Sequence, residues 1–140
     1  RIRKREALVE AIFSVLAASS VSFLIRRIWR RPRPFTRGKT ARIAHGDNAS
    51  FPSNHTLNAV AAAFSLILSR QSGGNRLLGW ALLQGLSRVF AGVHYMSDII
   101  GSAVLAACCA VRVHSSQRLR KLSRQLAYVC TEAEDILRRK

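Results

Sequence analysis

The stretch SRVFAGVHYMSD, residues 87 to 98, connects two apolar segments and holds several reactive side chains. His94 and Asp98 are four residues apart, so on a helical turn the carboxylate can reach the imidazole and keep one ring nitrogen protonated. The other ring nitrogen is then available as a nucleophile or base. This spacing also arises often by chance, and a single arginine such as Arg88 more often lays its stem along apolar surface than grips a phosphate. The stretch therefore needs support from the rest of the chain.

Outward from this stretch, four apolar segments predict an all-α transmembrane helical bundle. They cover residues 7–25, 56–68, 77–93 and 99–113. The first would be about 28 Å long as a helix, close to a hydrocarbon core of roughly 30 Å. The other three are short unless their flanks continue the helix. A soluble helical bundle is the alternative.

Charge and composition narrow the class of partner. The 140 residues include 23 Lys and Arg against 7 Asp and Glu, for a net charge of +16, and 49% are hydrophobic. Such a charge calls for an anionic partner, which is a nucleic acid, an anionic membrane or a phosphorylated substrate. Together with the apolar segments, it favours a membrane protein with basic loops. A basic membrane-anchored or nucleic-acid-binding module would explain the charge without any enzyme, and it would make the arginines important and the histidines dispensable.

The distribution of charge predicts an orientation. If each apolar segment crosses once, residues 26–55 and 94–98 fall on one face, and residues 1–6, 70–76 and those from 112 onward fall on the other. Fourteen of the 23 basic residues belong to the second face, so the positive-inside rule places it in the cytoplasm. The first face would then look toward the periplasm or cell exterior. Its eight basic residues, with Arg88 near the end of the third apolar segment as the ninth, suit a polyanionic substrate.

Two further polar stretches share this first face. RRIWRRPRPF, residues 26–35, has five arginines and two prolines and predicts a rigid cationic platform, although a basic flank that binds lipid headgroups is equally consistent. FPSNHT, residues 51–56, places His55 at a helix start, where a histidine is usually structural. His45 and Asp47 also lie on this face, but a loop histidine beside a Gly-Asp turn is usually incidental.

These three stretches resemble, in order and spacing, the three-part signature of the type 2 phosphatidic acid phosphatase (PAP2) superfamily, K-x6-RP, PSGH and SR-x5-H-x3-D. The matching residues are Arg26 and Arg33-Pro34, then Pro52-Ser53-Asn54-His55, then Ser87-Arg88, His94 and Asp98. Two positions differ. Arg26 stands where the family usually has lysine, which exchanges a compact ammonium for a planar fork, and Asn54 replaces glycine.

The resemblance implies a metal-independent phosphatase that needs no cofactor and works in two steps. His94 would attack the terminal phosphorus and become a phosphohistidine, Asp98 would orient it, and His55 would protonate the leaving group. Water would then hydrolyse the phosphoenzyme. The phosphate-binding residues would be Arg26, Arg33, Ser53, Asn54, Ser87 and Arg88, which stabilise the transferring group by charge and position.

The resemblance also suggests a substrate, a lipid phosphate in the membrane. RPRPF together with PSNH resembles the bacterial undecaprenyl pyrophosphate phosphatase branch. Phosphatidic acid, phosphatidylglycerophosphate and lipid A phosphates remain alternatives, and soluble acid phosphatases and vanadium haloperoxidases share the signature. The sequence leaves the oligomeric state open.

The family's membrane members usually have six transmembrane helices, with the signature on the last four, so residues 1–115 would form a phosphatase core whose first two helices lie outside this chain. Residues 116–140 predict an amphipathic cytoplasmic tail helix that either lies on the lipid surface or pairs with a partner helix. Its apolar stripe consists of Leu119, Leu122, Leu126, Val129, Ala133 and Ile136.

Overall fold

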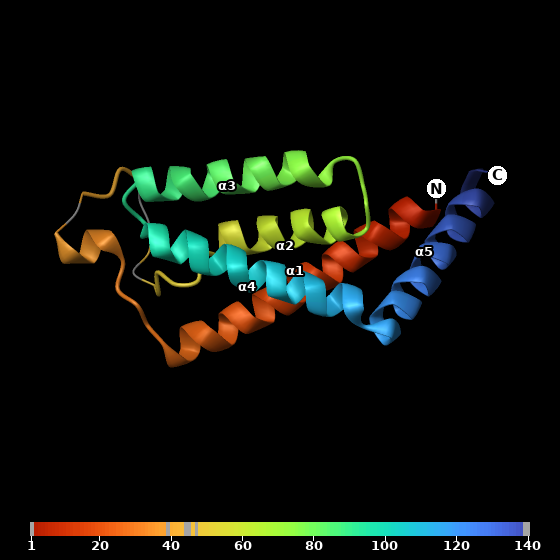
Figure 1. Cartoon of the computed structure of the whole chain (residues 1–140), viewed down its shortest axis with the longest axis horizontal. Helices are drawn as coiled ribbons and strands as arrows, with labels where there is room; N and C mark the ends of the chain where they lie inside the picture. Colours follow the sequence, from red (N-terminus) through yellow and green to blue (C-terminus); the bar gives the residue numbers. More distant parts are fainter. Residues whose placement is uncertain (1, 39, 44–45, 47, 139–140) are drawn as a thin grey trace.

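The structure is a computed structural model that describes residues 2–38, 40–43, 46 and 48–138. Throughout these residues the regular structure is helical, which confirms the predicted all-α class. The elements are α1 (Ile2–Ile28), a short 3-10 helix η1 (Pro34–Arg37), α2 (Asn54–Leu68), α3 (Gly74–Phe90), α4 (Met96–Ser115) and α5 (Gln117–Arg138). Figure 1 shows α1 to α4 running alternately up and down the bundle, with α5 at the end where α1 begins.

Helix α2 is the centre of the bundle and packs against α1, α3 and α4. The buried core cluster is built largely from small side chains, namely Ala18, Leu57, Val60, Ala61, Ala81 and Ala106. Alanines at helix contacts allow the backbones to approach closely, a packing mode that is typical of membrane helices. The predicted apolar segments thus correspond to the four helices of one bundle.

Two of these helices, α1 and α4, are long and apolar enough to cross a membrane, judged by length and composition. Helix α2 is apolar but shorter. Large apolar side chains such as Leu16 and Phe23 of α1 and Val104 of α4 are exposed on the outside of the bundle. An outer surface of this kind favours a membrane protein over the soluble bundle.

The connection from α1 to α2 folds back over the end of the bundle where α1 and α3 finish and α2 and α4 begin (Figure 1). The Ser50 amide donates to the Arg31 carbonyl at 2.8 Å, so the two ends of this loop are tied together. Trp29 and Phe51 contribute a ring pair with centroids 5.4 Å apart. Phe51 also lies against Gly101 of α4, where a Cβ atom would come within 2.7 Å of the ring. The loop is therefore packed onto α4.

Helix α5 packs against the first turns of α1. Arg5 forms an ion pair with Glu134 and a hydrogen bond of 3.2 Å to Thr131, and Arg124 lies 3.4 Å from Glu6. The face of α5 that becomes buried carries small residues, Ser123 and Ala127. Most of the predicted apolar stripe instead stays exposed, with accessible fractions of 42% for Leu122, 41% for Leu126, 60% for Val129 and 61% for Ile136, whereas Leu119 is half-buried. The tail thus pairs with α1 through small and charged residues.

Candidate active site

The turn between α3 and α4 carries His94 and packs against the long connection between α1 and α2. Gly92 has a left-handed φ of 75°, and a Cβ atom there would come within 2.6 Å of the Thr40 carbonyl oxygen. Next to it, the Arg42 amide donates to the Ala91 carbonyl at 3.0 Å. Only glycine combines this backbone conformation with this close approach. The long loop and the histidine turn are consequently packed against each other.

The predicted pair of His94 and Asp98 is buried at the start of α4, with exposed fractions of 3% and 0%. His94 Nδ1 lies 3.6 Å from Asp98 Oδ2, which is a charge contact but longer than a good hydrogen bond. The same Oδ2 accepts from the Tyr95 amide at 2.9 Å and from the Ser50 hydroxyl at 2.5 Å. The Oδ2 atom of Asp98 therefore caps α4 and also faces His94.

Arg31 completes the surroundings of Asp98, and sequence reasoning gave it no role of its own. Its Nη1 donates to Asp98 Oδ1 at 2.6 Å and to the Ser97 hydroxyl at 3.0 Å. Its guanidinium also stacks on Tyr95, 4.5 Å from the ring centroid. The one signal in the sequence was its place in the arginine-rich stretch after α1. The structure thus adds Arg31 and Ser50 to the groups that hold the carboxylate.

Arg33 lies close to His94, but most of its donors bond to the loop. Its Nη1 donates to the Val93 carbonyl at 2.8 Å and lies 3.4 Å from His94 Nε2. Its Nε donates to the Asn48 carbonyl at 2.9 Å, and its Nη2 donates to the Asn48 side chain at 2.5 Å. Arg33 is buried and links the loop to the histidine turn.

Arg26 lies near the end of α1, and its side chain contacts the backbone of the PSNH stretch, residues 52–55. Its Nη2 donates to the Pro52 carbonyl at 2.5 Å. Its Nε is buried and makes no hydrogen bond within the part of the chain that the structure describes. A buried donor of this kind needs an acceptor, and a phosphate oxygen is one that would suit an arginine.

Ser53 and Asn54 are tied to neighbouring helices. The Ser53 amide donates to the Ser102 hydroxyl at 2.8 Å, and that hydroxyl donates to the Asp98 carbonyl at 2.6 Å. Asn54 Oδ1 accepts from the Ser22 hydroxyl at 2.6 Å. The amide that stands in place of the family's glycine therefore joins the start of α2 to α1.

The remaining signature residues, His55, Ser87 and Arg88, are more exposed than His94 and Asp98. His55 is exposed on the first turn of α2. The starts of α2 and α4 lie at the same end of the bundle (Figure 1). Ser87 is exposed and its hydroxyl donates to the Gln84 carbonyl at 2.7 Å, beside an apolar groove that Ala59 and Trp80 also line. Arg88 is half-buried, and its carbonyl accepts from the Val93 amide at 3.2 Å. His45 and Asp47 lie outside the described residues.

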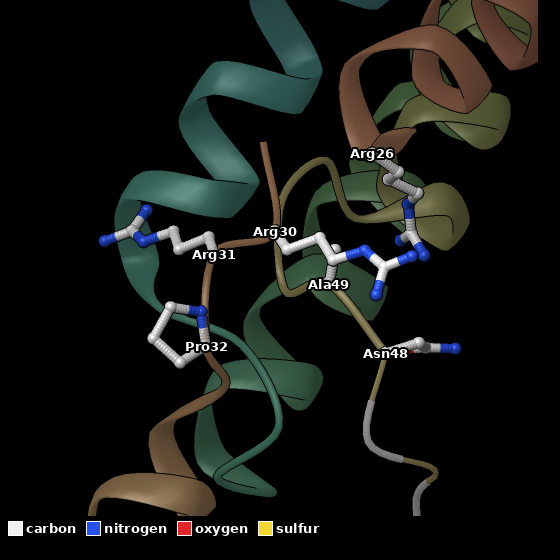
Figure 2. A pocket seen from close by; sticks show the side chains of 6 residues that line it. All are labelled: Arg26, Arg30, Arg31, Pro32, Asn48 and Ala49. Atoms are coloured by element: carbon white, nitrogen blue, oxygen red, sulfur yellow. The ribbon is translucent and has the colours of Figure 1, made fainter. Parts of the chain in front are cut away.

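A pocket of about 540 Å³ opens beside the buried pair. Its lining residues are Arg26, Arg30, Arg31, Pro32, Asn48 and Ala49. Figure 2 shows the side chains of Arg26 and Arg30 directed toward the same side of the loop, and that of Arg31 directed to the other side. Three guanidinium groups make this pocket suited to an anion. Within the described ranges, no cluster of three or more His, Cys, Asp or Glu side chains is placed to hold a metal ion.

Known proteins resemble this chain in sequence. Undecaprenyl-diphosphatase BcrC of Bacillus subtilis is 33% identical over 105 residues, which cover 74% of this chain and 54% of that protein. Decaprenylphosphoryl-5-phosphoribose phosphatase of Mycobacterium tuberculosis is 33% identical over 123 residues, covering 85% of this chain and 68% of the relative. The chain thus spans about half to two thirds of the length of these relatives.

Two solved structures share the fold. The crystal structure of Aquifex aeolicus LpxE aligns with a TM-score of 0.69 and 23% identity, covering 76% of this chain and 66% of the other. The transmembrane PAP2 type phosphatidylglycerolphosphate phosphatase of Bacillus subtilis aligns with a TM-score of 0.56 and 24% identity, covering 73% and 54%. The sequence model of the PAP2 superfamily matches residues 7–121, which include all three parts of the signature. The histidine, its aspartate and the arginines are gathered at one end of this bundle. Because the family model matches most of the chain, the chain belongs to the PAP2 superfamily.

Proposed function

We propose that this protein removes the terminal phosphate from a membrane lipid phosphate or diphosphate, with undecaprenyl diphosphate as the substrate and undecaprenyl phosphate as the product. The observation that carries the proposal is the buried His94–Asp98 pair beside a pocket lined by three arginines. Two curated relatives whose names refer to polyprenyl phosphates support this substrate class over phosphatidic acid, phosphatidylglycerophosphate and lipid A phosphates.

The first step is transfer of the phosphoryl group to His94. Nε2 of the neutral imidazole attacks the terminal phosphorus in line, a P–N bond forms, and the P–O bond to the remaining lipid phosphate breaks. His55 protonates the departing oxygen. Asp98 holds the proton on Nδ1 and stabilises the positive ring, which requires the present separation of 3.6 Å to shorten when substrate binds.

The second step is hydrolysis of the phosphohistidine. Water attacks the phosphorus, the P–N bond breaks, His55 accepts the proton from the water, and inorganic phosphate leaves. Arg26, Arg33 and Arg88 neutralise the equatorial oxygens together with Ser53, Asn54 and Ser87. For Ser87, which now faces a different groove, this role requires a rotation or a shift of the last turn of α3. The reaction needs no metal or other cofactor.

The proposed setting is the plasma membrane of a bacterium. Residues 1–115 form the membrane core, the active site faces the periplasm or cell exterior, and residues 116–140 lie on the cytoplasmic side. The partners are the lipid substrate and the membrane itself, and no nucleic acid. The basic residues at the end where α1 begins and α5 packs support this orientation.

The test is phosphate release by the protein in detergent or proteoliposomes from undecaprenyl diphosphate and the three alternative lipids. His94→Ala should lower turnover by on the order of 100-fold or more. Undecaprenyl diphosphate should be the preferred substrate, EDTA should leave the rate unchanged, and an acid-labile phosphoenzyme should form only when His94 is present. Near-normal turnover by His94→Ala would refute the mechanism, and salt-sensitive DNA binding without phosphatase activity would support a binding module instead.

A further inference from the structure

The arginine pocket is a neighbour of the catalytic pair and is distinct from it. The residues that line it do not include His94, which is almost fully buried. Two contacts connect them. Arg31 of the pocket donates to Asp98 at 2.6 Å, and Asn48 of the pocket accepts from Arg33, whose Nη1 lies 3.4 Å from His94 Nε2. An anion in the pocket would thus lie one side chain away from a phosphate that is being attacked.

The four arginines in this region differ in how far their donors are already used. Arg31 is paired with Asp98, and Arg33 donates to Asn48 and Val93. Arg26, by contrast, has a buried Nε without an acceptor among the described residues. Arg30 is exposed, and in the part of the chain that the structure describes its side chain makes no hydrogen bond or ion pair. Arg26 and Arg30 are therefore the members that retain donors for a ligand.

We propose that Arg30, which is outside the family signature, binds the phosphate that stays on the lipid, beside Arg26 on the transferring phosphate, and so makes the site selective for lipid diphosphates over lipid monophosphates. This inference rests on the proposed function and extends it to substrate choice. Both guanidinium groups point to the same side of the pocket (Figure 2), and a planar fork donates two parallel hydrogen bonds to a phosphate. A monophosphate substrate would fill only the position next to His94.

The assignment also explains the charges of the pocket. Its described lining residues carry three guanidinium groups and no carboxylate, and the nearest acid, Asp98, already accepts from Arg31. A single phosphate next to His94 leaves the charge of Arg30 uncompensated. A second phosphate compensates it, because the phosphates of a diphosphate are joined by one bridging oxygen and reach both positions at once.

The experiment compares kcat/KM for undecaprenyl diphosphate and undecaprenyl phosphate in the wild type, in Arg30→Gln and in Arg37→Gln. Arg37 is the matched control, because it is an exposed arginine of the same loop and does not line the pocket. Arg30→Gln should lower the ratio of diphosphate to monophosphate kcat/KM about tenfold or more, the usual effect of losing hydrogen bonds to a charged group. Arg37→Gln should leave the ratio unchanged.

Inhibition provides a second measurement that does not depend on turnover of either lipid. Methylenediphosphonate should inhibit the wild type more strongly than inorganic phosphate does, and Arg30→Gln should remove this difference. If Arg30→Gln lowers both lipid activities equally, or neither, the subsite is refuted while the proposed function stands. If the variant changes only the dependence on anionic lipid content, Arg30 binds neighbouring headgroups and the inference is also refuted. If the wild type acts on neither lipid, the proposed function itself fails.

Discussion

Replacing Gly92 by alanine should destabilise the protein, because this glycine joins the histidine turn to the long loop. An alanine held at φ 75° costs about 1–2 kcal/mol relative to a right-handed conformation. Its Cβ would also approach the Thr40 carbonyl oxygen to 2.6 Å, so the loop must move. That movement endangers the hydrogen bond from the Arg42 amide to the Ala91 carbonyl, worth about 1 kcal/mol. We expect a total loss of about 2–3 kcal/mol.

Gly79→Ala is the matched control for this substitution. Gly79 lies in the interior of α3, is exposed, and would place its Cβ in open space. Alanine has the higher helix propensity, so this variant should gain up to about 1 kcal/mol. The two glycines thus predict changes of opposite sign from the same chemical substitution.

The assay is thermal unfolding of the purified proteins in detergent, followed by circular dichroism at 222 nm at one scan rate. For a chain of this length, a loss of 2–3 kcal/mol corresponds to a midpoint lower by roughly 6–12 °C. Gly92→Ala should also lower phosphate release, because the turn that it disturbs presents His94. If Gly92→Ala unfolds at or above the midpoint of Gly79→Ala, the close contact between loop and turn is wrong.

Two further changes test the contacts around the site and the tail. Ser50→Ala removes one donor from the Asp98 carboxylate and should lower kcat for phosphate release about tenfold. Ser20→Ala removes an exposed hydroxyl on α1 and should have no effect. Equal rates for the two variants would contradict the role of Ser50. Ala127→Leu should push α5 away from α1 and speed tryptic cleavage of the tail, because Ala127 is fully buried there. Ala133→Leu, on the exposed stripe, should leave the cleavage rate unchanged. Equal cleavage of the two variants would contradict the packing of α5 on α1.

The apolar segments predicted the bundle because side chains that avoid water mark a helix even without tertiary information. They located the boundaries less well. The first segment was expected over 7–25, but α1 covers Ile2–Ile28, since charged residues of its first turns pair with α5. The third was expected to continue to residue 93, but α3 ends at Phe90, because the turn at Gly92 has a left-handed backbone. Hydrophobicity cannot distinguish Val93 in a turn from valine in a helix.

The site was predictable where a motif fixes a spacing and was missed where folding brings distant residues together. His94 and Asp98 are four residues apart and lie together as expected. Ser50 and Arg31 reach Asp98 from 48 and 67 residues away, and no local pattern encodes those contacts. Asn54 was predicted to bind phosphate from its place in the motif, yet its side chain contacts Ser22 on α1, 32 residues earlier. That phosphate role stays a prediction.

The alternating direction of the helices explains why three separated motifs meet. The connections after α1 and after α3 lie at the same end of the bundle (Figure 1), and the three parts of the signature lie in or next to these connections. Asp98 joins them physically, because its carboxylate caps α4 and accepts from Ser50 and Arg31 of the other connection. An Asp98→Asn variant would therefore disturb the fold and the histidine together, so its loss of activity would not identify a catalytic role. Ser50→Ala leaves the helix cap and the Arg31 pair intact, and for this reason it is the sharper test of what the carboxylate does for His94.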